Sequence, residues 1–183
     1  MPSRLVTLDS VSPVSDPWLP PGANSLAGNN AEAWADLLAP DGFTDAGVDG
    51  GADLRISASA PGVFDYSYQL ALPADSSNTQ RYAGATAAFF VANWAHDVLY
   101  AQGFDEKAGN GQRLNFSRGG LEGDPVHLEV HDYWLRNAAS MTTPADGRPG
   151  RLQAALFDGV GPSLLGLSVD GGGLDAGLVA AGP

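Results

Sequence analysis

The stretch TQRYAGATAAFFVANWAHDVLYAQGFDEKAGN, from Thr79 to Asn110, decides the fold of this chain. It contains no proline, and between residues 83 and 102 only Gly84 is a poor helix former, at a cost of about 1 kcal/mol relative to alanine. The spacing of its apolar residues predicts one long helix over about 80–102, ended by Gly103. The apolar stripe comprises Tyr82, Ala85, Phe89, Ala92, Val98 and Leu99, widened by Phe90 and Trp94. Such a wide apolar surface indicates a core helix.

Extended segments flank this helix on both sides. In Val63–Leu72 and in Pro125–Asp132, apolar and polar residues alternate with the period of two that is typical of strands. The other expected elements are a strand at Arg4–Leu8, a helical or extended piece at Ala31–Leu38, a strand at Leu54–Ser59, an extended Arg136–Ser140, and a strand or helix at Arg151–Phe157. Strands in groups around one helix predict an α+β fold.

Composition shifts divide the chain into three parts. Residues 1–27 are rich in proline and predict an extended arm lying on something larger. Residues 28–158 hold the periodic segments and form the main lobe. Residues 159–183 are small, apolar and rich in glycine, and indicate the start of a following module.

The charge of the chain limits its partners. It carries 21 acidic and 9 basic residues, for a net charge of −12, which argues against binding to nucleic acid or to an anionic membrane surface. It has no cysteine, which excludes disulfides and thiolate zinc sites, and no apolar run long enough to span a membrane. The first ten residues show no secretory leader, so we expect either an intracellular protein or a sequence without its leader.

Two local patterns carry ligand chemistry. His127, Glu129 and His131 alternate on a predicted strand and could converge on zinc only if the strand curves or bulges. The commoner arrangement for such a pattern is a polar face turned to solvent. The loop Asp41–Asp53 has an acidic spacing similar to that of calcium loops, but it lacks the EF-hand register and a closing glutamate, which favours a solvated turn.

The histidine of the long helix does not complete an active site. His96 has no histidine or glutamate four residues away, so HExxH geometry is absent, and we expect a core histidine with polar partners. Asp97 beside it is expected to hold a neighbouring loop. The sequence shows neither a G-x-S-x-G nucleophile turn nor a phosphate-binding loop. The residues alone therefore give no complete catalytic set.

Four motifs in order resemble the fungalysin family of secreted zinc metallopeptidases. They are GNNAEAWAD (28–36), NWAHDVLYAQGFDEKAGN (93–110), NFSRGGLEGDPV (115–126) and TPADGRPGRLQAALFD (143–158). The resemblance implies a gluzincin of thermolysin-like build, with a β-rich N-terminal lobe packed around one long helix. Zinc in that family comes from an HExxH helix and a downstream glutamate, and zinc is expected in the complete enzyme, with calcium as a further candidate cation.

The chain lacks HExxH, so the resemblance implies the N-terminal lobe alone, without catalytic or metal-binding residues and inactive by itself. The Gly-rich 159–183 would then begin an inserted protease-associated domain. The implied partners are a peptide or protein substrate and the missing catalytic half, and the implied location is extracellular. In the family an edge strand pairs with the substrate backbone. Asn137 and Ala138 match its substrate-binding residues, whereas Ser140 and Gly111 replace aromatic residues.

Three functions remain open from the sequence. The first is one wall of the cleft of a zinc endopeptidase, and the alternative is a non-catalytic fungalysin-like binding or structural module. The third is a metal-binding β protein that uses His127, Glu129 and His131. If the chain is one lobe of a larger enzyme, its helix should keep an apolar flank uncovered, because Phe89, Phe90 and Trp94 can all be covered only if both pairs of strands pack onto the helix.

Overall fold

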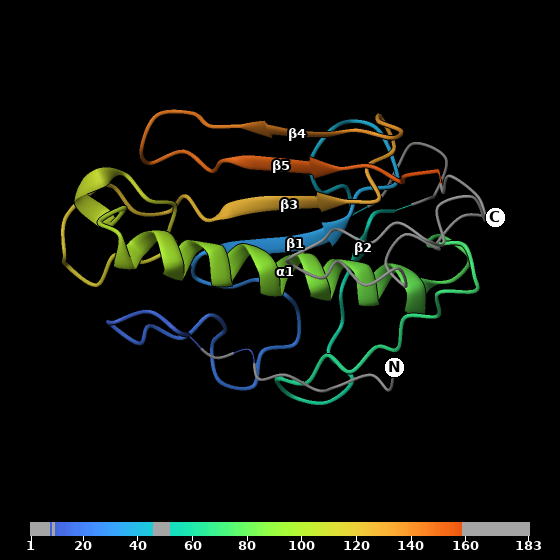
Figure 1. Cartoon of the computed structure of the whole chain (residues 1–183), viewed down its shortest axis with the longest axis horizontal. Coiled ribbons are helices and arrows are strands. Elements are labelled where there is room, and N and C mark those ends of the chain that lie inside the picture. Colours follow the sequence, from blue (N-terminus) through green and yellow to red (C-terminus); the bar gives the residue numbers. More distant parts are fainter. Residues whose placement is uncertain (1–7, 9, 46–51, 159–183) are drawn as a thin grey trace, which may run out of the picture.

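A mixed five-stranded sheet lies against one long helix (Figure 1). The computed structural model describes residues 8, 10–45 and 52–158. The elements are β1 (Ala31–Ala35), β2 (Leu54–Arg55), α1 (Asn78–Ala101), the 3-10 turn η1 (Glu106–Ala108), β3 (Val126–Val130), β4 (Ala139–Thr142) and β5 (Arg151–Ala154). The strand order is β2-β1-β3-β5-β4, in which β1, β3 and β5 are parallel and the two outer strands antiparallel. The predicted α+β fold is confirmed.

Helix α1 has well-formed ends. The Ser77 side chain accepts a hydrogen bond from the Gln80 N–H and caps the first turn. At the other end Gly103 is left-handed, with φ 97°, and its N–H donates to the Tyr100 carbonyl while the Phe104 N–H donates to the Leu99 carbonyl. These two bonds make a Schellman motif, so the predicted stop at Gly103 is confirmed.

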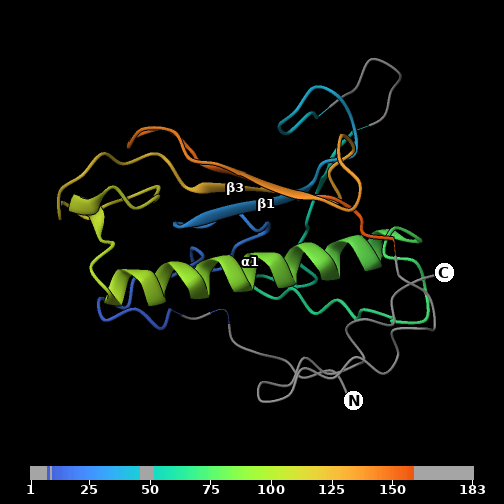
Figure 2. The ribbon, with the colours of Figure 1, turned by 45° about the horizontal axis from the view of Figure 1, so that its top comes forward.

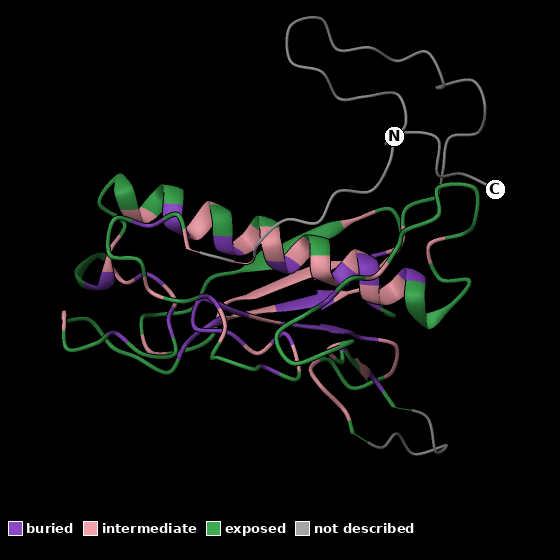
Figure 3. Ribbon diagram, turned by 90° about the horizontal axis from the view of Figure 1, so that it is seen from below, coloured by how far each residue is buried: buried purple, intermediate pink, exposed green. Residues whose placement is uncertain are grey.

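From Ala85 onward the buried residues of α1 are four positions apart, and their character changes along the helix. Ala85 and Phe89 are buried in its first half, and Asn93 and Asp97 in its second. Figure 3 shows the buried segments of α1 turned towards the sheet and the exposed ones away from it. The predicted apolar stripe is therefore wrong beyond Ala92, because polar Asn93 and Asp97 occupy the buried positions there.

The uncovered flank that we expected on α1 is present. Phe89 is fully buried and Phe90 partly buried, whereas Trp94 is 49% exposed. Further exposed apolar side chains on this helix are Val91, Val98 and Leu99.

The core lies between α1 and the sheet, and the segment before β1 closes it. Trp18 and Leu26 are each 1% exposed and belong to the same buried cluster as Phe89 and Leu128. The Trp18 ring packs edge-on against Phe90, with ring centroids 5.7 Å apart. Burial of each such large side chain stabilises the fold by roughly 1.5–3 kcal/mol.

The strand predictions had mixed outcomes. The sequence left the type of element undecided for Ala31–Leu38 and for Arg151–Phe157. The first contains β1, which lies between β2 and β3, and the second contains β5. The predicted strand Pro125–Asp132 is confirmed as β3. The predicted strand Leu54–Ser59 is reduced to the two residues of β2.

The predicted strand Val63–Leu72 is wrong. Its backbone forms no ladder beyond an isolated bridge at Val63, and it ends in a turn at residues 70–72. The side-chain amide of buried Gln80 replaces a neighbouring strand: its oxygen accepts the Gln69 N–H at 2.7 Å, and its Nε2 donates to the Gln69 carbonyl at 2.9 Å. Tyr66 packs against Tyr82 of α1, whereas Tyr68, Leu70 and Leu72 of the same alternating set are exposed.

Four predictions fall partly or wholly outside the described residues: the extended arm 1–27, the strand Arg4–Leu8, the middle of the loop Asp41–Asp53, and the Gly-rich residues 159–183. Within the described residues, none of the helices has the length and apolarity needed to cross a membrane.

Candidate functional site

Strand β4 forms one edge of the sheet, and all four of its residues are exposed. It pairs with β5 on one side, and among the described residues no strand pairs with it on the other. An open edge presents unpaired N–H and C=O groups, to which an extended peptide can add as a further strand.

The register shows which backbone groups of β4 are free. The Ala155 N–H donates to the Ala138 carbonyl at 3.2 Å, and Ser140 lies opposite Gln153. In an antiparallel pair, residues alternate between backbone groups directed at the partner strand and groups directed away from it. Ser140 therefore faces β5, whereas Ala139 and Met141 direct their N–H and C=O to the open edge.

The two residues singled out by the resemblance lie just before β4. Asn137 has a left-handed backbone, with φ 55°, and its N–H donates to the Leu156 carbonyl at 2.9 Å. Its side-chain amide nitrogen donates to the Asp158 carboxylate at 2.8 Å. The carbonyl of Ala138 is taken by Ala155. The structure thus places both residues at the start of the edge strand, with Asn137 held in position by Asp158.

His96 and Asp97 hold the segment before β1 against α1. His96 Nδ1 lies 3.2 Å from the Asp97 carboxylate, and its Nε2 lies 3.3 Å from the Asn110 amide nitrogen. The other Asp97 oxygen accepts bonds from the Val11 N–H at 2.8 Å and the Trp18 indole N–H at 2.9 Å. Burial acts to raise the pKa of Asp97, but the hydrogen bonds from these groups hold it below its usual value. The expectations of a satisfied histidine and of an aspartate that holds a loop are confirmed.

The set His127, Glu129 and His131 does not converge. The His127 ring packs on Trp34, with ring centroids 5.1 Å apart, on the face of the sheet opposite α1. His131 has a positive φ of 58°, which turns its ring towards Gly84 of α1 on the other face. The predicted zinc arrangement is therefore not formed. Glu129 is fully buried, so the alternative of a solvent-exposed face is also wrong.

Glu129 instead meets two aspartates that the sequence analysis did not single out. Single carboxylate oxygens of Asp36, Glu129 and Asp132 all lie within 4.8 Å of one another. Asp36 directly follows β1 and Asp132 follows β3, so both lie at the carboxyl end of parallel strands. The three side chains are 0%, 0% and 2% exposed.

Loops cover this face of the sheet. Figure 2 shows the segment after β1 on the side of the sheet away from α1. Its Phe43 packs edge-on against Trp34, with centroids 6.0 Å apart, and its Asp41 accepts a hydrogen bond from the Tyr133 hydroxyl. Asp53 caps the end of the same loop and accepts bonds from the Leu37 and Thr44 N–H groups, as a plain turn would.

The carboxylates of the cluster disfavour one another's ionisation. Burial raises the pKa of Asp36 to about 7, and the charges of Asp53 and Glu129 add to the effect. Burial likewise raises the pKa of Glu129 to about 7, against the attraction of Arg151. Ionised carboxylates are stable in such a place only with a compensating positive charge.

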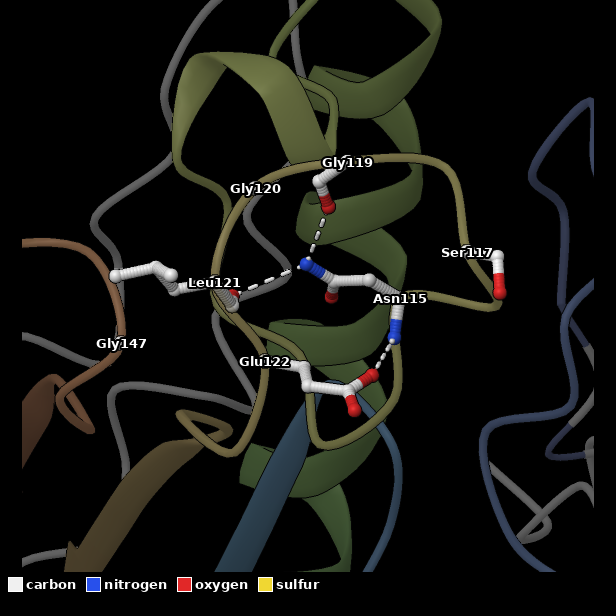
Figure 4. A pocket seen from close by; sticks show the side chains of 7 residues that line it. All are labelled: Asn115, Ser117, Gly119, Gly120, Leu121, Glu122 and Gly147. Carbon is white, nitrogen blue, oxygen red and sulfur yellow. Dashed lines mark hydrogen bonds between the residues drawn. The ribbon is translucent and has the colours of Figure 1, made fainter.

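The surface has two further pockets of note. The larger is an open hollow of about 670 Å³ between the loop 115–122 and Gly147, shown in Figure 4. The Asn115 amide there donates to the carbonyls of Gly119 and Leu121, at 2.8 and 3.0 Å. The smaller pocket, about 340 Å³, lies by His131, Arg81 and Trp134. The Asn115 amide thus holds the loop that lines the larger hollow.

Comparison with known families identifies the family of the chain. A profile of the Fungalysin metallopeptidase (M36) family matches residues 11–180. The chain belongs to the fungalysin family. The match includes Trp18, the Gly28 turn, the His96-Asp97 pair and β4, so the structural features described above lie within the fungalysin region.

The relatives that the chain matches are named extracellular metalloproteinases. Extracellular metalloproteinase 1 of Phaeosphaeria nodorum is 37% identical over 140 residues, covering 76% of this chain and 20% of the relative. Extracellular metalloproteinase 5 of Arthroderma gypseum is 36% identical over 148 residues, covering 79% and 22%. Probable extracellular metalloproteinase 4 of Arthroderma benhamiae is 45% identical over 91 residues, covering 50% and 14%. The aligned region thus makes up less than a quarter of each of these fungalysins.

Proposed function

We propose that this chain forms the N-terminal lobe of a secreted fungalysin-type zinc endopeptidase, where it supplies one wall of the substrate cleft. Strand β4 pairs with the backbone of the peptide substrate. The observation that carries this proposal is the fully exposed edge of β4 in a member of a metallopeptidase family. Secretion is supported by the names of the relatives, which are extracellular metalloproteinases.

The peptide pairs with the outward backbone groups of Ala139 and Met141. Because alternate residues of a strand direct their backbone groups to the same edge, these two residues offer four hydrogen-bonding groups to an extended peptide. Asn137 and Ala138 lie at the start of this edge and complete the substrate-binding segment. The bond between Asn137 and Asp158 fixes the entry to the strand.

Zinc in the complete enzyme is held by residues outside this chain. The sequence has three histidines and no HExxH. His96, His127 and His131 lie against different partners, namely Asp97, Trp34 and Gly84. In such an enzyme the zinc polarises the attacking water and the substrate carbonyl. The lobe described here contributes substrate alignment, and the rest of the enzyme covers the exposed flank of α1.

Proline substitutions in β4 test the role of its edge. Met141→Pro removes an outward N–H, so we expect stability within about 1 kcal/mol of the parent and at least a tenfold loss of affinity for an extended casein-derived peptide. Ser140→Pro is the matched control, because it removes an N–H directed at β5 and should lower stability by about 1 kcal/mol or more. Urea unfolding measures the stability of each variant. In the parent protein, slower amide hydrogen exchange at Ala139 and Met141 in the presence of the peptide measures its pairing with β4.

A parent protein whose β4 amides gain no protection from the peptide would contradict the pairing. Unchanged affinity in Met141→Pro would do the same. Peptide binding by a chain that never supports hydrolysis, even when joined to a metal-binding remainder, would instead favour a non-catalytic binding module.

A further inference from the structure

The cluster of Asp36, Glu129 and Asp132 has oxygens without partners. Asp36 Oδ1 and both carboxylate oxygens of Glu129 are buried and accept no hydrogen bond. Asp132, in contrast, accepts bonds from the Trp134 N–H at 2.9 Å and from the Gln153 amide at 2.8 Å. A buried carboxylate oxygen without a donor costs the full desolvation penalty, so these oxygens require a positive partner.

The neighbouring side chains supply too little positive charge. Arg151 Nε lies 3.2 Å from Glu129 Oε1, but the same guanidinium also contacts Asp41 at 3.2 Å. The carboxylate of Asp53 adds further negative charge nearby, and this charge helps to raise the pKa of both Asp36 and Glu129. Among the described residues, Arg151 is therefore the one cation in contact with Glu129, and it shares its charge with Asp41.

We propose that Asp36, Glu129 and Asp132 form a binding site for a hard divalent cation, calcium in the first place. All three side chains offer oxygen, which calcium, magnesium and manganese prefer, and the cluster contains no nitrogen or sulfur ligand of the kind that selects zinc. Two oxygens bound to one calcium at about 2.3–2.6 Å can lie up to about 5 Å apart. The three oxygens, all within 4.8 Å of one another, are close enough to bind one calcium ion after a small adjustment of their side chains.

The site has a structural role. It joins the end of β1 to the end of β3 and the turn after it, where Asp36 already bonds to Val130 and Tyr133 through its backbone. A cation there would hold the loops that cover this face of the sheet. The site belongs to this chain alone and does not depend on whether the chain takes part in peptide hydrolysis.

Thermal unfolding with added metal tests the site. The chain is unfolded by heat in about 0.15 M KCl, once with EDTA and once with CaCl₂. This salt concentration screens the attraction of exposed charges beyond about 8 Å. Calcium about 100-fold above its Kd should raise the Tm by about 5 °C or more. Terbium in place of calcium should emit on tryptophan excitation, because Trp34 lies opposite Glu129 in the sheet, and CaCl₂ should quench this emission.

Glu129→Gln and Asp36→Asn should each abolish the calcium-dependent rise in Tm and the terbium signal. In EDTA at pH 8 we expect both variants to be at least as stable as the parent, so a loss of binding cannot be assigned to unfolding. Asp65→Asn changes the charge equally at an exposed site and should keep the full response.

An unchanged Tm of the parent in CaCl₂ would overturn the proposal, as would equal calcium shifts in the parent and Glu129→Gln. MgCl₂ giving the same shift at the same concentration would overturn the assignment to calcium.

Discussion

Replacing Asp97 by alanine is expected to lower the free energy of unfolding by about 3–5 kcal/mol. The carboxylate is 2% exposed and accepts hydrogen bonds from Ser10, Val11, Ser12 and Trp18 as well as contacting His96. Alanine leaves these buried donors without an acceptor, and it removes the hydrogen bond that the Trp18 indole N–H donates to Asp97. The cost is large because each stranded donor keeps its desolvation penalty.

Urea unfolding of Asp97→Ala, with Asp97→Asn and Asp65→Ala beside it, measures this effect. Asparagine keeps one acceptor oxygen and should fall between the parent and alanine. Asp65 is exposed, so its replacement should change stability by no more than about 0.5 kcal/mol. A loss below about 1 kcal/mol for Asp97→Ala would show that the segment before β1 does not depend on this carboxylate.

Replacing Gly28 by alanine should be similarly severe, at about 3 kcal/mol or more. A β-carbon at this position would lie 2.3 Å from the Trp18 carbonyl oxygen, 2.9 Å from Phe89 Cζ and 3.0 Å from the Ala31 carbonyl oxygen. Two of these contacts are backbone atoms that cannot rotate away. The close approach lets the Gly28 N–H bond to Ala31 and the Asn29 N–H bond to Trp18.

Gly150→Ala is the matched control for this substitution. Its β-carbon would meet the flexible end of Met141 at 3.3 Å, so we expect a change within about 1 kcal/mol. Tm and near-ultraviolet circular dichroism report both variants, since Trp18 should lose its fixed environment only in Gly28→Ala. Equal stability of the two variants would contradict the close packing around Gly28.

The sequence predicted helix α1 and strand β3, whose signals lie within a few neighbouring residues. The C-terminal end of α1 follows from Gly103, whose capping chemistry acts within a few residues. Strand β3 was predicted because Leu128 and Val130 alternate with polar residues. The fungalysin family was evident from four motifs in order, and the family profile confirms it.

Contacts distant in sequence decided the elements that were predicted wrongly. Nothing local in Val63–Leu72 shows that the Gln80 side chain takes the place of a strand partner. Nothing in Pro125–Asp132 shows that the loop with Phe43 covers the opposite face and buries Glu129. The inward turn of His131 depends on a positive φ that the sequence does not signal.

The residues of the candidate sites were likewise predicted in part and missed in part. Asn137 and Ala138 came from the resemblance, and their role in substrate binding remains a prediction. Asp36 and Asp132 were missed because each is one aspartate among many, and only the pairing of β1 with β3 brings them to Glu129. The one available signal was their common position in the C-terminal part of the segments Ala31–Leu38 and Pro125–Asp132.

Casein hydrolysis by this chain, alone and joined to the remainder of a fungalysin relative, tests the lobe assignment most directly. In the fusion, this chain replaces the aligned segment of extracellular metalloproteinase 5 of Arthroderma gypseum. We expect no hydrolysis by the chain alone with added zinc, and hydrolysis by the fusion that a zinc chelator abolishes. Zinc-dependent hydrolysis by the chain alone, or a folded, zinc-loaded fusion that leaves casein intact, would contradict the assignment.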